Sequence, residues 1–161
     1  MEVGVFNHEP DGYACPFCRL VAGGDDPRDP GAQRAVVHRG ELATAVISPR
    51  WWPKNPGHVL VVPNAHHENL YDLPARDGHA VHDLVREIAI ALKKGYGCDG
   101  TSVRQHNEPA GNQDVWHYHV HVLPRYDGDD LYRARPLPDF MTAEHREPYA
   151  ARLRPHLESR A

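Results

Sequence analysis

Three histidines occupy alternate positions in the segment WHYHVHVLPR, at His117, His119 and His121. Alternate side chains of an extended strand project from the same face, so we expect the three imidazoles to share one face. At about 3.3 Å per residue, the first and third histidines lie roughly 13 Å apart along such a strand. Because zinc holds nitrogen ligands at about 2.0–2.1 Å, one extended strand cannot bring all three rings to one metal ion.

The second group with chemical potential is the motif CPFC, which contains Cys15 and Cys18. Its spacing is that of half a zinc site, and a redox pair or two unpaired cysteines are the alternatives. The remaining ligands could come from His66 or His67 in PNAHHENL and from one end of the histidine strand. A closed set of four protein ligands leaves no position for water, so the zinc ion would be structural.

The middle histidine, His119, is the candidate nucleophile. A neutral imidazole can attack when one ring nitrogen is hydrogen-bonded and the other faces the substrate. Phosphorus is a natural target, because water can later break the phosphoramidate that forms. The preceding loop NEPAGNQD, which is otherwise an ordinary polar hairpin loop, offers a phosphate the backbone near Gly111 and the side chains of Asn107, Asn112 and Gln113.

Hydrophobic patterning predicts the elements that position these residues. QRAVVH, ELATAVIS, HVLVVP, TSVRQHN and VWHYHVHVLP have the composition of strands. A short helix follows CPFC, and a long helix begins near Pro74, with apolar residues at helical spacing until Gly95 and Gly97 end it. A last helix is predicted over residues 143–158, with Thr142 as its N-cap. The pattern indicates an α+β fold with a mostly antiparallel sheet and helices to one side.

Composition limits the class of protein. A chain of 161 residues fits one domain, which we place at residues 15–161 after a mobile segment at 1–14. The net charge of -4 argues against a general nucleic-acid binder. No apolar run approaches the roughly 18 residues of a membrane span, and the acidic N-terminus lacks a signal pattern. Three cysteines are too few for a disulfide framework, so we expect a cytoplasmic protein.

Together these segments resemble the histidine triad (HIT) family of nucleotide hydrolases and transferases. The resemblance rests on HVHVL preceded by His117 and Tyr118, on NPGHVLVVPNAH, on the helix after NLYDLP, and on HNEPAGNQDVWHYHVHVLPRYDGDDLY. It extends from Cys15 to about Tyr132. It implies a HIT-like fold with a five-stranded antiparallel sheet, and usually a homodimer.

The resemblance also implies a reaction. His119 would attack the α-phosphorus of a nucleoside phosphoramidate, a dinucleoside polyphosphate or a nucleotide sugar. A covalent nucleotidyl-histidine would form, and water or another acceptor would then take the nucleotide. His121 would contact the phosphate, and His58 of the PGH motif would belong to the same nucleotide site.

In zinc-containing members and the related galactose-1-phosphate uridylyltransferases, the ligands are a Cys-x-x-Cys pair, a later histidine and the first triad histidine. His66 is preferred to His67 because it occupies the motif position three residues after Pro63. Carried onto this sequence, the resemblance implies the zinc ligands Cys15, Cys18, His66 and His117.

The chain departs from the family pattern at several positions. Many members have an aspartate before PGH that holds the ribose hydroxyls, whereas here Ser48 is the nearest candidate. Trp51 and Trp52 could stack on a base or serve in packing. Asn112 replaces a usual glycine, and Asp114 stands where a serine or threonine commonly donates to the phosphate. A carboxylate there would repel a phosphate unless it is protonated, turned away or paired with a cationic part of the substrate.

Three alternative functions remain open from the sequence. One is a dinucleoside polyphosphate phosphorylase or other nucleotidyltransferase, which shares the first half-reaction with a hydrolase. A second is a non-catalytic nucleotide-binding protein, favoured by Asp114 and by the missing ribose acid. The third is a hydrolase with a catalytic zinc ion, which the closed ligand set disfavours.

Overall fold

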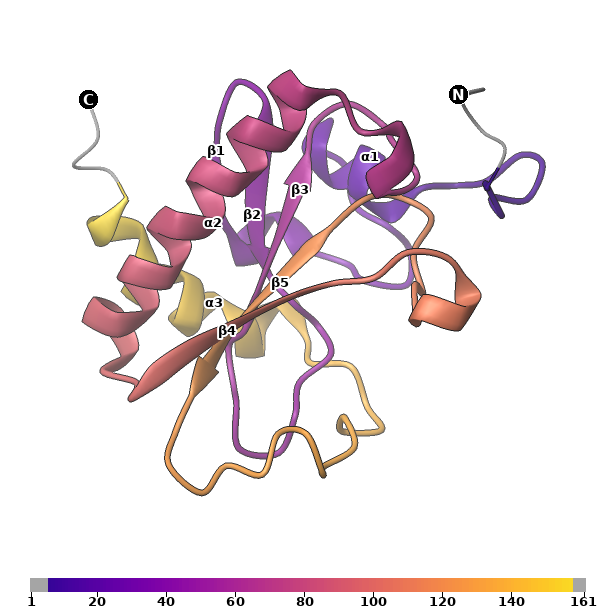
Figure 1. Ribbon diagram of the computed structural model, residues 1–161. Helices are drawn as coiled ribbons and strands as arrows, with labels where there is room; N and C mark the ends of the chain where they lie inside the picture. Colours follow the sequence, from indigo (N-terminus) through magenta and orange to yellow (C-terminus); the bar gives the residue numbers. More distant parts are fainter. Residues whose placement is uncertain (1–5, 158–161) are drawn as a thin grey trace.

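The computed structural model describes residues 6–157 and places five antiparallel strands in one sheet (Figure 1). The order across the sheet is β1-β2-β3-β5-β4, so β1 and β4 form its edges. The strands are β1 (Val36–Arg39), β2 (Ala43–Ile47), β3 (Val59–Pro63), β4 (Gly100–Gln105) and β5 (Val120–Arg125). The predicted α+β class with a five-stranded antiparallel sheet is confirmed.

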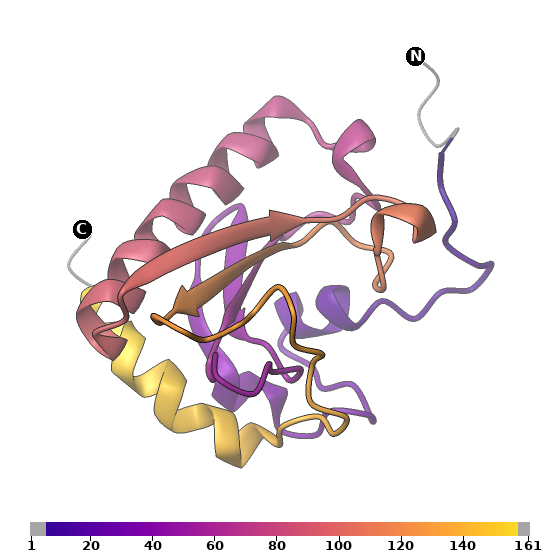
Figure 2. The same ribbon diagram turned by 60° about the horizontal axis from the view of Figure 1, so that its bottom comes forward.

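Two helices, α2 (Ala75–Tyr96) and α3 (Ala143–Leu153), pack against each other and cover one face of the sheet (Figures 1 and 2). The short helix α1 (Pro16–Val21) lies away from them (Figure 2). All residues of β2 and β3 are buried, so both faces are covered at the centre of the sheet. Within the described residues, no helix combines the length and apolar character that a membrane span requires.

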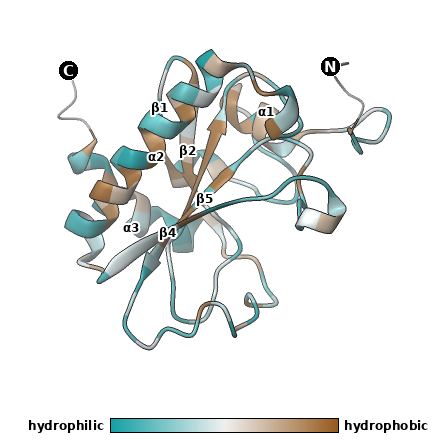
Figure 3. Cartoon of the chain, in the orientation of Figure 1, coloured by the Kyte–Doolittle hydropathy of each residue, from teal (hydrophilic) through white to brown (hydrophobic). Residues whose placement is uncertain are grey.

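The long helix α2 follows the predicted periodicity. Its buried positions include Val81, Leu84, Val85, Ile88 and Leu92, which recur at the spacing of one helical face. Figure 3 shows the apolar colouring of β3, the central strand that α2 contacts. The sheet and the helix therefore bury their apolar faces against each other.

The helix passes through Gly95, where the sequence predicted its end, and continues to Tyr96. Gly97 then ends it in the left-handed conformation, with φ of 67°. At Gly95 a Cβ atom would lie 2.7 Å from the carbonyl oxygen of Arg152. The first glycine therefore permits the close approach of α3, and only the second stops the helix.

The C-terminal helix is shorter than predicted. Thr142 is its N-cap as expected, and its side chain accepts a hydrogen bond from the amide of His145 at 3.1 Å. The α-helix ends at Leu153 and is followed by a 3₁₀ turn over Arg154–His156. Pro155 explains the end of the α-helix, because proline has no amide hydrogen to donate to the carbonyl four residues earlier. Residue 158, the predicted end, lies outside the described residues.

The histidine strand also begins later than predicted, at Val120 instead of near Val115. Val120 is the first residue of β5, and pairing with both neighbouring strands begins there, opposite Val61 of β3 and Gln105 of β4. Before it, the amide of Tyr118 donates to the carbonyl of His67 at 2.7 Å. His117 and His119 therefore lie in an irregular segment just ahead of the strand, and only His121 lies within it.

Part of the predicted mobile segment at residues 1–14 is described. The amides of His8 and Glu9 donate to the two carboxylate oxygens of Glu68, at 2.7 and 2.8 Å. Residues 1–5 lie outside the described residues. These contacts fix where the segment runs, and its mobility stays a prediction.

The buried carboxylate of Asp129 holds the end of β5. It accepts hydrogen bonds from the Arg125 guanidinium at 2.8 and 2.9 Å, from the Asn55 side chain at 2.9 Å, and from the amides of Tyr126 and Leu131. The pKa of Asp129 lies far below its ordinary value. The ion pair with Arg125 is the largest cause, and the other hydrogen-bond donors lower the pKa further. This network anchors the loop that follows the histidine strand.

We expect Asp129→Asn to lower the free energy of unfolding by about 3 kcal/mol, because it leaves Arg125 without its buried charge partner. Since the folded pKa is depressed, the stabilisation is complete above about pH 4 and is lost as the pH falls through the folded value. Urea unfolding at pH 7 and pH 3 measures both effects. An equal stability difference between wild type and variant at the two pH values would contradict this assignment.

Candidate functional site

A cluster of two cysteines and two histidines forms at the start of α1. The Sγ atom of Cys15 lies 3.3 Å from Nδ1 of His117, and Sγ of Cys18 lies 3.3 Å from Nδ1 of His66. The two Nδ1 atoms are 3.1 Å apart, and Cys18 is 3.6 Å from His117. All four donor atoms lie within 4.8 Å of one another. The structure thus brings together the four residues predicted to be zinc ligands.

The spacing of these atoms fits a tetrahedral zinc ion. With bond lengths of about 2.3 Å to sulfur and 2.1 Å to nitrogen, the edges of such a tetrahedron are about 3.3–3.8 Å. The four contacts of 3.1–3.6 Å are close to this range. Burial raises the pKa of the Cys15 thiol to about 12, so a thiolate there depends on the charge of a bound cation.

In both cluster histidines, His66 and His117, Nε2 contacts an acceptor outside the cluster, and this contact sets the tautomer. Nε2 of His117 donates to the carbonyl of Pro63 at 2.9 Å, and Nε2 of His66 lies 2.5 Å from the Glu9 carboxylate. Both Nδ1 lone pairs are therefore free to face the cluster. His67, the alternative ligand, points elsewhere, with Nε2 at 2.8 Å from Asp77.

A cavity of about 790 Å³ opens on the face of the sheet away from α2 and α3. A row of paired residues crosses its floor from β2 to β4, namely Val46, Leu60, His121 and Arg104. Because side chains alternate along a strand, residues two positions away face the same cavity. These are Ser48, His58, His119 and His106, all of which line it. The strand period therefore assembles this site from four separate segments.

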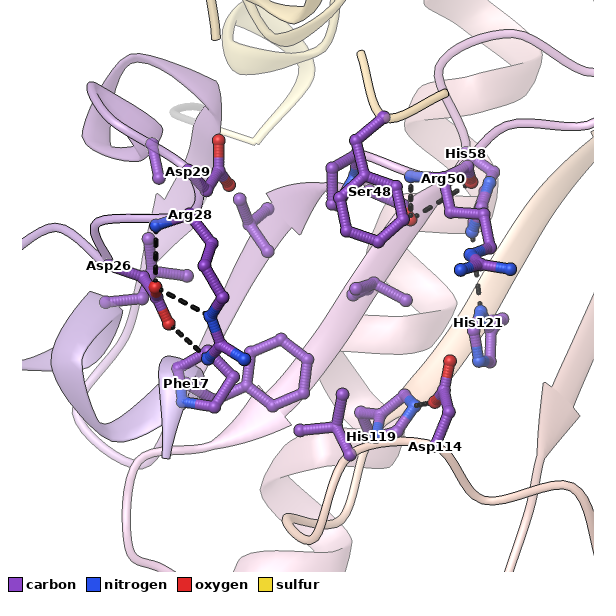
Figure 4. Close-up of a pocket in the computed structure, with 18 of the residues that line it drawn as sticks. Phe17, Asp26, Arg28, Asp29, Ser48, Arg50, His58, Asp114, His119 and His121 are labelled. Atoms are coloured by element: carbon purple, nitrogen blue, oxygen red, sulfur yellow. Dashed lines mark hydrogen bonds and ion pairs between the residues drawn. The ribbon is translucent and has the colours of Figure 1, made fainter. Parts of the chain in front are cut away.

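The two ends of the cavity differ in chemistry (Figure 4). One end holds His58, His119 and His121 together with Arg50 and Asp114. Arg104 lies at the same end, because it pairs with His121 across β4 and β5. The other end has apolar walls from α1 and β2, and charged groups from the loop before β1. There Asp26 accepts two hydrogen bonds from the Arg28 guanidinium, and Asp29 pairs with the fully buried Arg146. The acids at this far end are thus neutralised by arginines.

His119 lies at the centre of the first end with one nitrogen already fixed. Its Nδ1 donates to the carbonyl of His117 at 2.8 Å, so Nε2 carries the free lone pair. The residue is 4% exposed, and its ring packs 5.3 Å from that of Phe17. This is the arrangement that a nucleophilic imidazole requires.

His121 and His58 form a neutral pair beside it. Nδ1 of His121 lies 3.4 Å from Nε2 of His58, and the His119 and His121 rings are 5.0 Å apart. Burial lowers the pKa of His58 to about 3, and it lowers the pKa of His121 well below the ordinary value. Both rings are therefore uncharged near neutral pH and can donate one hydrogen bond each without adding charge.

Arg104 brings positive charge to the same place. Its guanidinium lies 5.0 Å from the Trp52 ring centre and 5.8 Å from that of Tyr132. Its Nε is buried and has no hydrogen-bond partner within the described residues. An arginine held between aromatic rings with a spare donor is suited to bind a phosphate.

Asp114 lies beside His119, the candidate nucleophile. One carboxylate oxygen is 3.5 Å from Nε2 of His119, and the Asp114 side chain is 64% exposed. The interaction with His119 lowers the pKa of Asp114, so the carboxylate is ionised near neutral pH. Figure 4 shows its carboxylate directed at the His119 ring.

The residues predicted to bind a nucleotide divide into two groups. Ser48, His58, Asn112 and His121 line the cavity, together with the predicted nucleophile. Asn107, Gly111 and Gln113 do not contribute to its wall. The Gln113 side chain is used within the loop, where it donates to the carbonyls of Glu68 and Val115 and accepts from the amide of Glu108.

Sequence reasoning missed the arginines of the cavity and the loop of residues 24–32. Arg104 lies in a predicted strand, but its place opposite His121 depends on the strand register, which the sequence did not predict. No local pattern indicates that Asp29 pairs with Arg146, since they are 117 residues apart in sequence. That contact exists only through the packing of α3 beside the loop.

The sheet, the three alternate histidines at the start of β5 and the PGH segment entering β3 define a protein of the histidine triad fold. Comparison with known proteins agrees. The family model described as "HIT domain" matches residues 32–128. A HIT-like protein of Methanocaldococcus jannaschii is 33% identical over 115 residues, which are 71% of this chain and 81% of the relative. The chain therefore belongs to the HIT family, whose members are in general nucleotide hydrolases and transferases.

Two further proteins bear on the site. The crystal structure of a Zn-bound histidine triad family protein from Mycobacterium smegmatis superposes with a TM-score of 0.71 at 28% identity, and covers 91% of this chain and 94% of its own. An adenylylsulfatase of Arabidopsis thaliana is 25% identical over 123 residues, or 76% of this chain and 58% of the relative.

Proposed function

We propose that this chain is a zinc-containing nucleotide hydrolase or nucleotidyltransferase that works through a nucleotidyl-histidine at His119. The observation that carries the proposal is the hydrogen bond from Nδ1 of His119 to the carbonyl of His117, which leaves Nε2 free inside the cavity. Membership of the HIT family and the likeness to an adenylylsulfatase support a substrate with a nucleotide α-phosphate.

In the first step, the Nε2 lone pair of His119 forms a bond to the α-phosphorus. The bond from phosphorus to the leaving group breaks, and its electron pair departs with that group, which takes a proton from solvent where it needs one. In the second step, water attacks the phosphorus, the N–P bond breaks, and its pair returns to Nε2. The water proton goes to solvent, and the nucleoside monophosphate leaves. A transferase would use another acceptor in place of water.

The surrounding groups have roles that follow from their charge. We assign the nonbridging oxygens of the α-phosphate to His121, whose Nδ1 contacts His58, and to Arg104, which together offer one neutral donor and one cation. Ser48 and Asn112 are the predicted nucleotide-binding residues that line the same cavity and can reach the sugar or phosphate. We assign the apolar far end, with Phe17 among its walls, to the base.

We further propose that Cys15, Cys18, His66 and His117 hold one structural zinc ion. When bound, the metal supplies a crosslink between α1, the segment after β3 and the segment before β5. His117 then places its own carbonyl, which orients His119. Thiolate ligation needs reduced cysteines, and all three cysteines are free, which supports a cytoplasmic location.

Intact-mass spectrometry tests the proposed reaction. Protein incubated with a panel of nucleoside phosphoramidates, dinucleoside polyphosphates and nucleotide sugars is quenched early and weighed, and peptide mapping locates any adduct. We expect one nucleoside monophosphate on His119. The closeness of Asp114 to Nε2 favours a second candidate, a non-catalytic nucleotide-binding protein. Saturable binding without an adduct or turnover across the panel would support that candidate instead.

We propose a homodimer as the assembly. The edge strand β4 has alternating exposed residues, and Val103 is 53% exposed. An exposed edge strand can pair with a second copy of itself. Light scattering after size exclusion should give twice the mass of 18.1 kDa. A mass of one chain across micromolar concentrations would rule the dimer out.

A further inference from the structure

The carboxylate of Asp114 differs from the other acids that line the cavity. Asp26 and Asp29 at the far end each pair with an arginine. Within the described residues, Asp114 forms an ion pair with His119 alone, at 3.5 Å. Arg50 also favours the ionised form of Asp114, but its effect is smaller than that of His119. Asp114 thus presents a negative charge at the nucleophile that no arginine neutralises directly.

The position of this charge relates it to the leaving group. An in-line attack begins with the reacting atoms about 3–3.5 Å apart and places the leaving group on the side of phosphorus away from Nε2. His119 is 4% exposed, whereas the Asp114 side chain beside it is 64% exposed. With the base assigned to the end walled by α1 and the loop before β1, the leaving group lies at the histidine end, where the Asp114 side chain is exposed.

A charge placed there discriminates between leaving groups. A polyphosphate or sulfate leaving group would bring further negative charge against an ionised carboxylate, and the two would repel. An amine with a second, protonated amino group would instead be attracted, as charged groups across an interface are when their signs are opposite. The α-phosphate itself is compensated by Arg104 and Arg50, which lie at the same end.

We propose that Asp114 makes this chain selective for nucleoside phosphoramidates whose leaving amine carries a positive charge. The proposal rests on the function proposed above and specifies its substrate class. In the reaction, Nε2 of His119 bonds to phosphorus and the P–N bond breaks. The electron pair goes to the amine nitrogen, which takes one proton from solvent. Asp114 contacts the distant ammonium and takes no part in the bond changes, so it is a specificity determinant.

A matched series of substrates isolates this effect. Adenosine 5′-phosphoramidates of 1,2-diaminoethane, propylamine and β-alanine share the P–N bond and end in an ammonium, a methyl and a carboxylate group. For the wild type we expect kcat/KM to fall in that order, by about tenfold or more from first to last, as a cation is exchanged for an anion near a partly exposed charge. In Asp114→Asn the three values should agree within about threefold.

Controls separate charge from folding. Asp114 is exposed, so Asp114→Asn and Asp114→Ser should unfold at the wild-type temperature. Asp139→Asn removes an exposed carboxylate next to Phe140 of the cavity wall and should keep the wild-type order. Equal rates for the three wild-type substrates, or an order that survives in Asp114→Asn, would overturn the inference alone. Absence of turnover and adduct with every substrate would remove the proposed function and the inference together.

A divalent cation is the remaining possibility for the same carboxylate. The assay is therefore repeated with a dinucleoside polyphosphate, with and without added Mg²⁺. We expect slow turnover in both conditions and acceleration in Asp114→Ser, where the repulsion is gone. Rapid turnover that needs Mg²⁺ and is lost in Asp114→Asn would assign Asp114 to a metal ion and contradict our proposal.

Discussion

His119→Ala should lower turnover by at least about a thousandfold and abolish the nucleotidyl adduct, because no other imidazole offers a free nitrogen in the same place. His121 lies on the same face, but its Nδ1 contacts His58 and its ring centre is 5.0 Å from that of His119. Steady-state rates and intact-mass spectra with the best substrate of the panel measure both effects.

His82→Ala is the matched control, since His82 is an exposed histidine of α2 on the helical layer across the sheet from the cavity. It should keep both the rate and the adduct. Wild-type turnover in His119→Ala would sink the covalent mechanism. Loss of the adduct with turnover maintained would instead indicate direct attack of water on the substrate.

The second large effect concerns the metal. The variant Cys15→Ser/Cys18→Ser should lose the one zinc ion per chain that elemental analysis is expected to find in the wild type. It should also lose about 3–5 kcal/mol of stability, because metal binding free energy is in part folding free energy. For a chain of this length, that corresponds to a fall in Tm of roughly 10 °C.

Cys98→Ser provides the comparison, because Cys98 is a buried free cysteine outside the cluster. It should keep the zinc ion. Retention of zinc by the double variant would disprove the ligand set. If the structural role is correct, zinc-free protein that is still folded should form the adduct on His119, whereas a catalytic metal would make the reaction strictly zinc-dependent.

Local patterns predicted most of the elements correctly, and the failures have specific causes. The apolar period from Val81 to Leu92 identified α2, because a helix that packs on a sheet needs one apolar face. Of the two glycines predicted to end it, Gly97 does so, whereas Gly95 serves a contact with Arg152, 57 residues later in sequence. The start of β5 was misplaced because strand composition continues to Val115, whereas pairing with β3 and β4 begins only at Val120.

In the candidate site, too, some residues were predicted correctly and others were not. The sequence placed Cys15, Cys18, His66 and His117 in one cluster through the family resemblance, and the structure brings them together. It also separated His117 from His119, because one metal ion cannot span an extended strand. Asn107 and Gln113 were predicted from polarity alone, and their side chains bond within the loop or to neighbouring segments.

By residue type and spacing, WHYHVHVLPR and CPFC predicted a candidate nucleophile at His119 and half of a metal site, and the family resemblance added His66 and His117 as its other ligands. Spacing along one chain fixes which side chains share a face, because the strand period is local. The tertiary structure alone decided which charges meet across segments. It placed Arg104 opposite His121, Arg146 against Asp29, and the carboxylate of Asp114 at Nε2 of His119. Electrostatic interaction depends on distance in space, so these pairings became visible only once the chain was folded.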